Sequence, residues 1–172
     1  MYLETKRLIL RTPTGADAAA YLPICNSEFV LRYNAMTTKT LSQVEKEFST
    51  QPENTILLIQ KATGRLLGAV FTGEDSLRYG VESVELSYFL AEAYTRQGYM
   101  REALDAVIAH IFTTTQAECI SARSFAPNAA SQRLLESLGF SCNGLIPRCV
   151  RGYGDIIYDD TLYSKFKGLQ YN

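Results

Sequence analysis

One short stretch between two apolar runs constrains the fold of this chain more than any other feature. Residues 94–103 read Tyr-Thr-Arg-Gln-Gly-Tyr-Met-Arg-Glu-Ala, and they separate the apolar run Leu86–Leu90 from the amphipathic run Ala103–Phe112. This order is typical of a strand, a tight loop and the start of a helix. The first backbone N–H groups of such a helix have no partners within it, and the helix dipole adds about half a positive charge there. The stretch therefore predicts a binding site for an anionic group such as a diphosphate.

The side chains of this loop also favour an anionic ligand. Gly98 lets the backbone bend without a Cβ in the way, and Arg96 and Arg101 bring positive charge to either side. The chain contains neither Gly-x-x-x-x-Gly-Lys-Ser/Thr nor Gly-x-Gly-x-x-Gly, which excludes the two best-known phosphate loops and with them an ATPase or a dinucleotide-binding protein. The residues expected to contact the ligand, through backbone or side chain, are Arg96, Gln97, Gly98, Tyr99, Met100 and Arg101.

Composition indicates a single globular domain over residues 1–172. Of the 172 residues, 47% are hydrophobic and 20% are charged, which is enough for one core. The net charge of -1 gives no sign of clustered lysine and arginine, so we expect neither a nucleic acid nor a membrane as partner. No run approaches the ~20 apolar residues of a membrane span, and Met1–Glu4 do not resemble a signal peptide. We expect a cytoplasmic monomer or homodimer.

The four cysteines do not indicate a metal site. Their spacing contains no Cys-x-x-Cys pair, and His110 is the one histidine of the chain. Free thiols in a reducing compartment are the simplest interpretation. The cysteines are Cys25, Cys119, Cys142 and Cys149.

Apolar patterning along the chain predicts a mixed α/β (α+β) fold. Apolar runs predict strands, 3.6-residue periodicity predicts helices, and a Ser42-x-x-Glu45 capping box marks one helix start. The expected strands are 4–11, 55–60, 66–71, 84–90, 119–123, 140–146 and 156–166. The expected helices are 14–24, 27–33, 42 to about 51, from the loop to about 114, and 127–138.

Motifs on both sides of the loop resemble one known family. Glu-Leu-Ser-Tyr at 85–88 precedes the loop, and Asn128-x-x-Ser131 and Leu-Gly-Phe at 138–140 follow it. Together these segments resemble the GNAT superfamily of acetyl-CoA-dependent N-acetyltransferases, and within it the RimJ/RimL-like branch, which acetylates protein N-termini and various small amines. The resemblance covers essentially the whole chain. It implies a mostly antiparallel central sheet of about six to seven strands flanked by helices, with the two central strands splayed, and acetyl-CoA as co-substrate without a metal.

The loop departs from the form that is usual in this superfamily. That form reads Gln/Arg-x-x-Gly-x-Gly/Ala, and the equivalent positions here are Thr95, Gly98 and Met100. Arg96 stands where many members carry another glycine. These departures bear on the details of cofactor contact, whereas backbone N–H donation survives any side-chain change that keeps the shape of the loop.

The resemblance implies where the pantetheine arm and the thioester would lie. The arm is peptide-like, so it can hydrogen-bond to a strand edge as though it were another strand. That edge would be Leu86–Leu90, splayed from the strand 119–123. A backbone N–H near Phe89 or Leu90 would then polarise the thioester carbonyl.

Acetyl transfer to an amine also needs a base and an acid. Glu85, at the base of the central strand, is the preferred base if no bulge turns its side chain to the other face. Glu82, Asp155, Asp159 and a water chain are alternatives. The tyrosine that many members use as the acid is replaced by Leu135. The resemblance implies Ser131 in this role, and Tyr88 on the central strand is the alternative.

The remaining candidates concern the cofactor and the acceptor. By resemblance, Asn128 hydrogen-bonds pantetheine, and helix N-capping is an equally sound role for it. Tyr33 and Asn34 are candidate acceptor contacts together with Glu85, with plain surface residues as the alternative. The acceptor is a small-molecule amine or a protein N-terminus. A non-catalytic acyl-CoA-binding or regulatory module and a nucleotide-binding protein are the competing functions.

Overall fold

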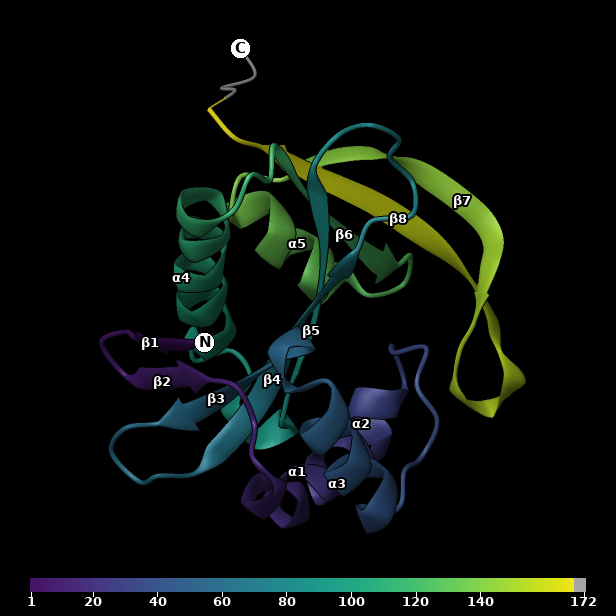
Figure 1. Cartoon of the computed structure of the whole chain (residues 1–172). Coiled ribbons are helices and arrows are strands. Elements are labelled where there is room, and N and C mark those ends of the chain that lie inside the picture. Colours follow the sequence, from purple (N-terminus) through teal and green to yellow (C-terminus); the bar gives the residue numbers. More distant parts are fainter. Residues whose placement is uncertain (169–172) are drawn as a thin grey trace.

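The apolar runs of the chain form one mixed sheet in the computed structural model, which describes residues 1–168 (Figure 1). The sheet has eight strands in the order β1-β2-β3-β4-β5-β6-β8-β7. Neighbouring strands are antiparallel except β5 and β6, which are parallel. The strands are β1 (Tyr2–Glu4), β2 (Leu8–Arg11), β3 (Thr55–Gln60), β4 (Leu66–Glu74), β5 (Ser83–Leu90), β6 (Cys119–Phe125), β7 (Ser141–Arg151) and β8 (Ile157–Phe166).

The sheet exceeds the predicted six to seven strands because the first predicted strand divides in two. The Thr5 N–H donates to the Leu8 carbonyl over 2.9 Å, so the chain turns back at this point. Leu3 then pairs with Leu10 across a short antiparallel ladder. The predicted run of alternating residues was correct, but it contains a turn that the alternation does not reveal.

Helices cover both faces of the sheet. A separate hydrophobic cluster lies between the sheet and the helices on each face. Helices α1, α2 and α3 pack on one face, where Phe89 lies, and α4 and α5 pack on the other, where Leu86 lies. Because side chains alternate along a strand, β5 contributes to both clusters. Figure 1 shows α1–α3 gathered at one end of the molecule. The helices are α1 (Ala18–Cys25), α2 (Glu28–Leu31), α3 (Leu41–Thr50), α4 (Tyr99–Thr114) and α5 (Ala129–Ser137).

The start of α3 corrects one local prediction. The helix begins after Thr40, whose side chain accepts a hydrogen bond from the Gln43 N–H over 3.3 Å. The Gln43 side chain in turn accepts from the Thr40 N–H over 2.7 Å. The capping box is therefore Thr40–Gln43 and not Ser42–Glu45. The two patterns overlap by two residues, and an apolar residue, Leu41, opens the helix directly after the first of them.

The parallel pair β5–β6 splits open toward its carboxyl end. Pairing extends only from Ser83 opposite Cys119 to Leu86 opposite Ala122. Beyond this point β5 continues to pair with β4, and β6 continues to pair with β8. The last four residues of β5 therefore present an edge without a strand partner on the side of β6. Among the helices of residues 1–168, none is long and apolar enough to cross a bilayer.

Candidate active site

A bent loop follows the split end of β5 and leads into α4. Gly98, the N-cap of α4, has a left-handed backbone with φ of 77°, and Arg96 has φ of 59°. The first hydrogen bond of the helix runs from the Glu102 N–H to the Gly98 carbonyl. Within residues 1–168, the N–H groups of Gln97, Gly98, Met100 and Arg101 donate to no protein acceptor. These donors are free to contact an anion at the positive end of the helix dipole.

The side chains of Tyr99 and Met100 turn away from the loop. They are 8% and 7% exposed and belong to the cluster between α4 and the sheet. The bulk of Met100, at a position where a small residue was expected, therefore lies in the core and leaves the loop surface clear. These two residues present only backbone groups to a ligand.

The two arginines of the loop differ in their surroundings. Arg96 is exposed and forms no ion pair or hydrogen bond with any residue that the structure describes. Arg101 is exposed too, but its Nη2 donates to the Ser137 carbonyl over 3.1 Å and its Nε lies 3.9 Å from Asp105. Arg96 is thus the more available positive charge beside the free N–H groups.

Sequence reasoning missed Arg7, which holds the loop from the start of β2. Its Nη1 donates to the Gln97 carbonyl over 2.9 Å, and its guanidinium lies 4.2 Å from the centre of the Tyr99 ring. Its Nε donates to Glu102 over 2.6 Å. At least 90 positions separate Arg7 from each of these partners in the chain, so no local pattern could have indicated the contact.

Glu102 completes this attachment in the first turn of α4. Its carboxylate also accepts from the Thr5 hydroxyl over 2.6 Å and from the Arg7 backbone N–H over 2.7 Å. Burial alone would raise the pKa of Glu102, but these hydrogen bonds and the Arg7 charge hold it below its usual value. The carboxylate therefore ties the turn before β2 to the start of α4 and fixes the loop between them.

Phe89 and Leu90 lie at the open end of β5. The Phe89 side chain is 5% exposed and packs with the α1–α3 cluster. The Ala91 N–H donates to the Leu67 carbonyl on β4 over 2.8 Å. Because successive N–H groups point to opposite edges of a strand, the Leu90 N–H faces the side from which β6 has diverged.

Two hydroxyl groups predicted from separate motifs come together on the α4–α5 face. Tyr88 Oη lies 2.9 Å from Ser131 Oγ. Burial raises the pKa of Tyr88 to about 12, although the hydrogen bond with Ser131 lowers it. Leu135, at the position where a tyrosine was expected, is 1% exposed in the core. The phenol beside Ser131 therefore comes from β5 and not from α5.

Asn128 adopts the capping role. Its Oδ1 accepts a hydrogen bond from the Ser131 N–H over 3.2 Å, as an N-cap of α5 does. The cap places the first turn of α5, and with it the Ser131 hydroxyl, against β5. Capping leaves the amide N–H groups of Asn128 without a protein acceptor among the residues described.

Glu85 lies on the opposite face from Tyr88. The β4–β5 register is unbroken from Gly68–Leu90 to Glu74–Val84, so no bulge turns the Glu85 side chain away from the face that it shares with Phe89. Its Oε1 lies 3.2 Å from Arg123 Nε. Burial raises the pKa of Glu85; the Arg123 charge opposes this shift, and the charges of Asp75 and Asp160 add to it.

The predicted acceptor residues have different roles in the structure. Tyr33 contacts the edge of the Tyr158 ring, with the centroids 6.3 Å apart, and Tyr158 stacks on Phe125 at 4.8 Å. The Asn34 side chain donates to the Val30 carbonyl at the end of α2. Tyr33 thus belongs to an aromatic cluster on the face that carries Arg123 and Glu85. The side-chain amide of Asn34 instead hydrogen-bonds to the backbone four residues earlier.

Most of the chain matches the model of one protein family. The model that describes the acetyltransferase (GNAT) domain matches residues 7–141, from Arg7 through β7's first residue. The chain belongs to the GNAT acetyltransferase family. It is accordingly an acetyl-CoA-dependent acyltransferase. It is also 28% identical over 175 residues, covering 96% of each chain, to the uncharacterized N-acetyltransferase YoaA of Bacillus subtilis strain 168.

Solved structures share the GNAT fold over nearly the whole length of the chain. The ribosomal-protein-S5-alanine acetyltransferase from Vibrio fischeri superposes with a TM-score of 0.87 at 19% identity, covering 98% of this chain and 97% of that one. RimL, a ribosomal L7/L12 alpha-N-protein acetyltransferase solved with coenzyme A, superposes with a TM-score of 0.81 at 15% identity, covering 96% and 98%. At these identities the likeness concerns the fold.

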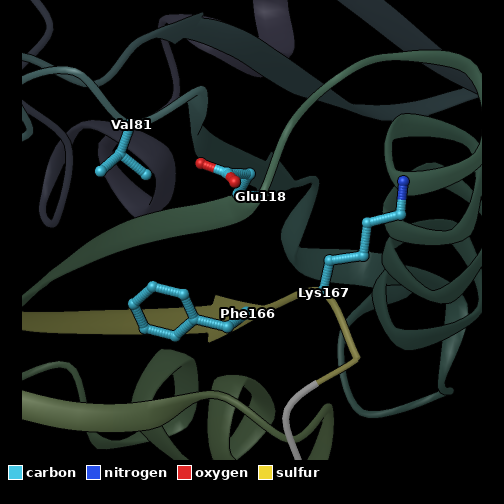
Figure 2. Close-up of a pocket in the computed structure, with 4 residues that line it drawn as sticks. All are labelled: Val81, Glu118, Phe166 and Lys167. Carbon is cyan, nitrogen blue, oxygen red and sulfur yellow. The ribbon is translucent and has the colours of Figure 1, made fainter.

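A cavity of about 380 Å³ in this GNAT domain lies away from the loop and the split. Val81 precedes β5, Glu118 precedes β6 and Phe166 ends β8, so the cavity lies where β5 and β6 begin, opposite the split. Figure 2 shows these residues around it, with Lys167 extending away from them. No predicted site residue lines this cavity. Across residues 1–168, no group of three or more His, Cys, Asp or Glu side chains could hold a metal ion.

Proposed function

We propose that this acetyltransferase transfers the acetyl group of acetyl-CoA to a primary amine by direct attack in a ternary complex. The observation that carries the proposal is the position of the free donors. The N–H groups of 97–101 follow the split end of β5, with a hydroxyl pair on one face of the split and a carboxylate on the other. Such a site can hold a long anionic co-substrate and admit an amine from the opposite side.

The donor half of the reaction uses backbone groups. The free N–H groups around Gly98, with Arg96 beside them, suit the diphosphate of coenzyme A. The pantetheine arm would follow the unpaired edge of β5 as an added strand. The Leu90 N–H faces this edge, and it would stabilise the negative charge that develops on the thioester oxygen during attack.

The proton transfers use the two faces separately. On the α1–α3 face, Glu85 takes a proton from the ammonium, directly or through water, and the freed lone pair attacks the thioester carbon. The C–S bond then breaks as the nitrogen loses its second proton to solvent, and the departing thiolate takes a proton from Ser131 on the α4–α5 face, which regains one from water. Tyr88 supports this transfer through its hydrogen bond with Ser131. The products are an N-acetyl amine and coenzyme A with a free thiol.

For the acceptor, a peptide N-terminus is the first candidate to test. The two solved neighbours described above are named as acetyltransferases of ribosomal proteins. A small-molecule amine is the second candidate. A cytosolic setting, in which thiols stay reduced, fits the four unpaired cysteines, and we propose a monomer or a homodimer.

The experiment that tests this function follows free thiol. The protein is incubated with acetyl-CoA and a panel of peptides and small amines, and coenzyme A release is measured against the same mixtures without protein. Release that depends on one of the amines, with an acetylated product of matching mass, supports the proposal. Tight coenzyme A binding without release for any amine would instead favour an acyl-CoA-binding module.

A further inference from the structure

Asp160, on β8, is a buried carboxylate without a hydrogen-bond donor. The residue is 5% exposed, and its Oδ1 is fully buried and unpartnered. No residue between 1 and 168 donates a hydrogen bond to either oxygen of this carboxylate. Burying a charge without a partner is unfavourable. By contrast Asp75, which is equally buried, accepts from the Leu77 N–H and pairs with Arg78. The fold therefore satisfies the Asp75 carboxylate and leaves the Asp160 carboxylate without a hydrogen-bond donor among residues 1–168.

The strand register places Asp160 on the face that carries Glu85. Asp160 pairs with Phe125 on β6, and Arg123 lies two residues before Phe125, so the three side chains share one face. Glu85 joins this face through its ion pair with Arg123. Asp160 interacts electrostatically with both Glu85 and Arg123.

The cluster of Glu85, Asp160 and Arg123 has two carboxylates and one guanidinium. Arg123 forms an ion pair with Glu85 at 3.2 Å, and no ion pair joins it to Asp160. Asp75 has its own partner in Arg78. Burial raises the pKa of Asp160, which the single Arg123 charge opposes. The positive charge of Arg123 thus balances only one of the two carboxylates, and a second cation would balance the other.

The surroundings of Asp160 suit a small organic cation. Tyr158, two residues earlier on the same face of β8, stacks on Phe125 and contacts Tyr33. Aromatic faces attract ammonium groups and tolerate short apolar substituents beside them. A cavity of about 310 Å³ is lined by Arg123 and by Leu162, which lies two residues after Asp160 on β8; Asp160 itself is not among the lining residues.

We propose that Asp160 binds the ammonium group of the acceptor and so selects primary amines that enter in the charged form. The inference rests on the proposed acetyl transfer and specifies how the acceptor is recognised. Asp160 holds the ammonium beside Glu85, which removes the proton before attack. A neutral acceptor of the same shape, such as the corresponding alcohol, lacks the charge that Asp160 requires.

The test is the substitution Asp160→Asn, which keeps the size of the side chain and removes its charge. With an amine that supports turnover, we expect the acceptor KM to rise about 10- to 100-fold, the range for loss of a charge-assisted hydrogen bond. The affinity for coenzyme A should stay unchanged. The matched control is Asp159→Asn: Asp159 lies one residue away on the other face, and its Oδ1 accepts from the Arg148 N–H. An unchanged acceptor KM in folded Asp160→Asn would overturn the inference.

A measurement on the wild-type protein keeps the test informative if Asp160→Asn does not fold. In the presence of coenzyme A, thermal stabilisation by a primary amine is compared with that by the alcohol of the same shape. Greater stabilisation by the amine supports the inference, and equal stabilisation overturns it. If no amine causes thiol release from the wild-type protein, the proposed function fails; if an amine does, an unchanged KM in Asp160→Asn refutes only the role of Asp160.

Discussion

Removal of the Ser131 hydroxyl tests the proposed acid. A positioned general acid contributes about 10²- to 10⁴-fold to a rate. The departing thiol has an ordinary pKa of about 8.5, so water can supply part of the protonation at neutral pH, and the effect should lie near the lower end. We expect Ser131→Ala to lower the rate of acetyl transfer about 100-fold and to leave the affinity for coenzyme A unchanged.

The hydrogen bond between Tyr88 and Ser131 makes the prediction sharper. At 2.9 Å the two hydroxyls interact directly, so Tyr88→Phe should lower the rate about 10-fold through Ser131. The double variant should be no slower than Ser131→Ala by more than about threefold, because groups that act as a unit are not additive. Since the pKa of Tyr88 is about 12, the phenol keeps its proton, and it should cause no loss of activity up to about pH 10.

Single-turnover measurements of thiol release, together with coenzyme A binding, separate the chemical step from affinity. Ser137→Ala is the matched control, because the Ser137 hydroxyl lies on the same helix and donates only to the Leu134 carbonyl. A rate for Ser131→Ala within twofold of wild type would refute the assignment of the acid. Fully multiplicative losses in the double variant would refute the claim that Tyr88 acts through Ser131.

Three further predictions concern the loop and the base. Gly98→Val should weaken coenzyme A binding at least 100-fold in calorimetry. A left-handed φ of 77° costs a residue with a Cβ about 1–2 kcal/mol, so the loop should change shape and its N–H groups should no longer point at the ligand. The control is Gly64→Val, at φ of 67° in the β3–β4 turn, which should lower stability by a similar amount and leave binding unchanged. Glu102→Gln should lower the unfolding free energy by about 1–3 kcal/mol at pH 7. Since the folded pKa of Glu102 is lowered, this difference from wild type should be present above about pH 4.3 and should disappear in denaturant titrations as the pH falls through the folded value. In wild type, kcat/KM should fall at low pH as Glu85 is protonated, with a midpoint above the usual glutamate pKa because the pKa of Glu85 is raised. Glu85→Gln should abolish this fall. The same fall in both proteins would argue for water as the base.

Local patterns explain why much of the fold was predictable. The predicted strand 55–60 matches β3, and the helix after the loop ends at Thr114 as predicted. The runs that form β5 and β6 were placed within two residues of their observed ends. In these segments the local sequence pattern, whether alternation, helical periodicity or a flanking glycine, agrees with the strand or helix that forms in the fold. The splayed pair followed from the family resemblance and is present in the structure.

Features that depend on distant residues were not predictable in this way. The contact of Arg7 with Gln97 and Glu102 joins the two ends of a long segment, and neither end carries a local sign of the other. The Asp160 carboxylate is a second example, because its Oδ1 receives no hydrogen bond from the neighbouring strand β6, and nothing in the local sequence indicates this. A charged residue in a strand pattern is usually interpreted as solvent-facing, whereas Asp160 is 5% exposed.

Two of the departures from the usual family pattern, Met100 and Leu135, have separate structural explanations, and together they argue for an intact site. Met100 could obstruct the loop only if its side chain faced the ligand, and it is directed into the core instead. Leu135 removes the usual phenol from α5, yet Tyr88 brings a phenol to Ser131 from β5. A buried phenol beside Ser131 and a carboxylate whose pKa burial raises lie on opposite faces of β5. Perturbed groups of this kind gather where chemistry needs them. The arrangement therefore favours a working acetyltransferase over a binding module.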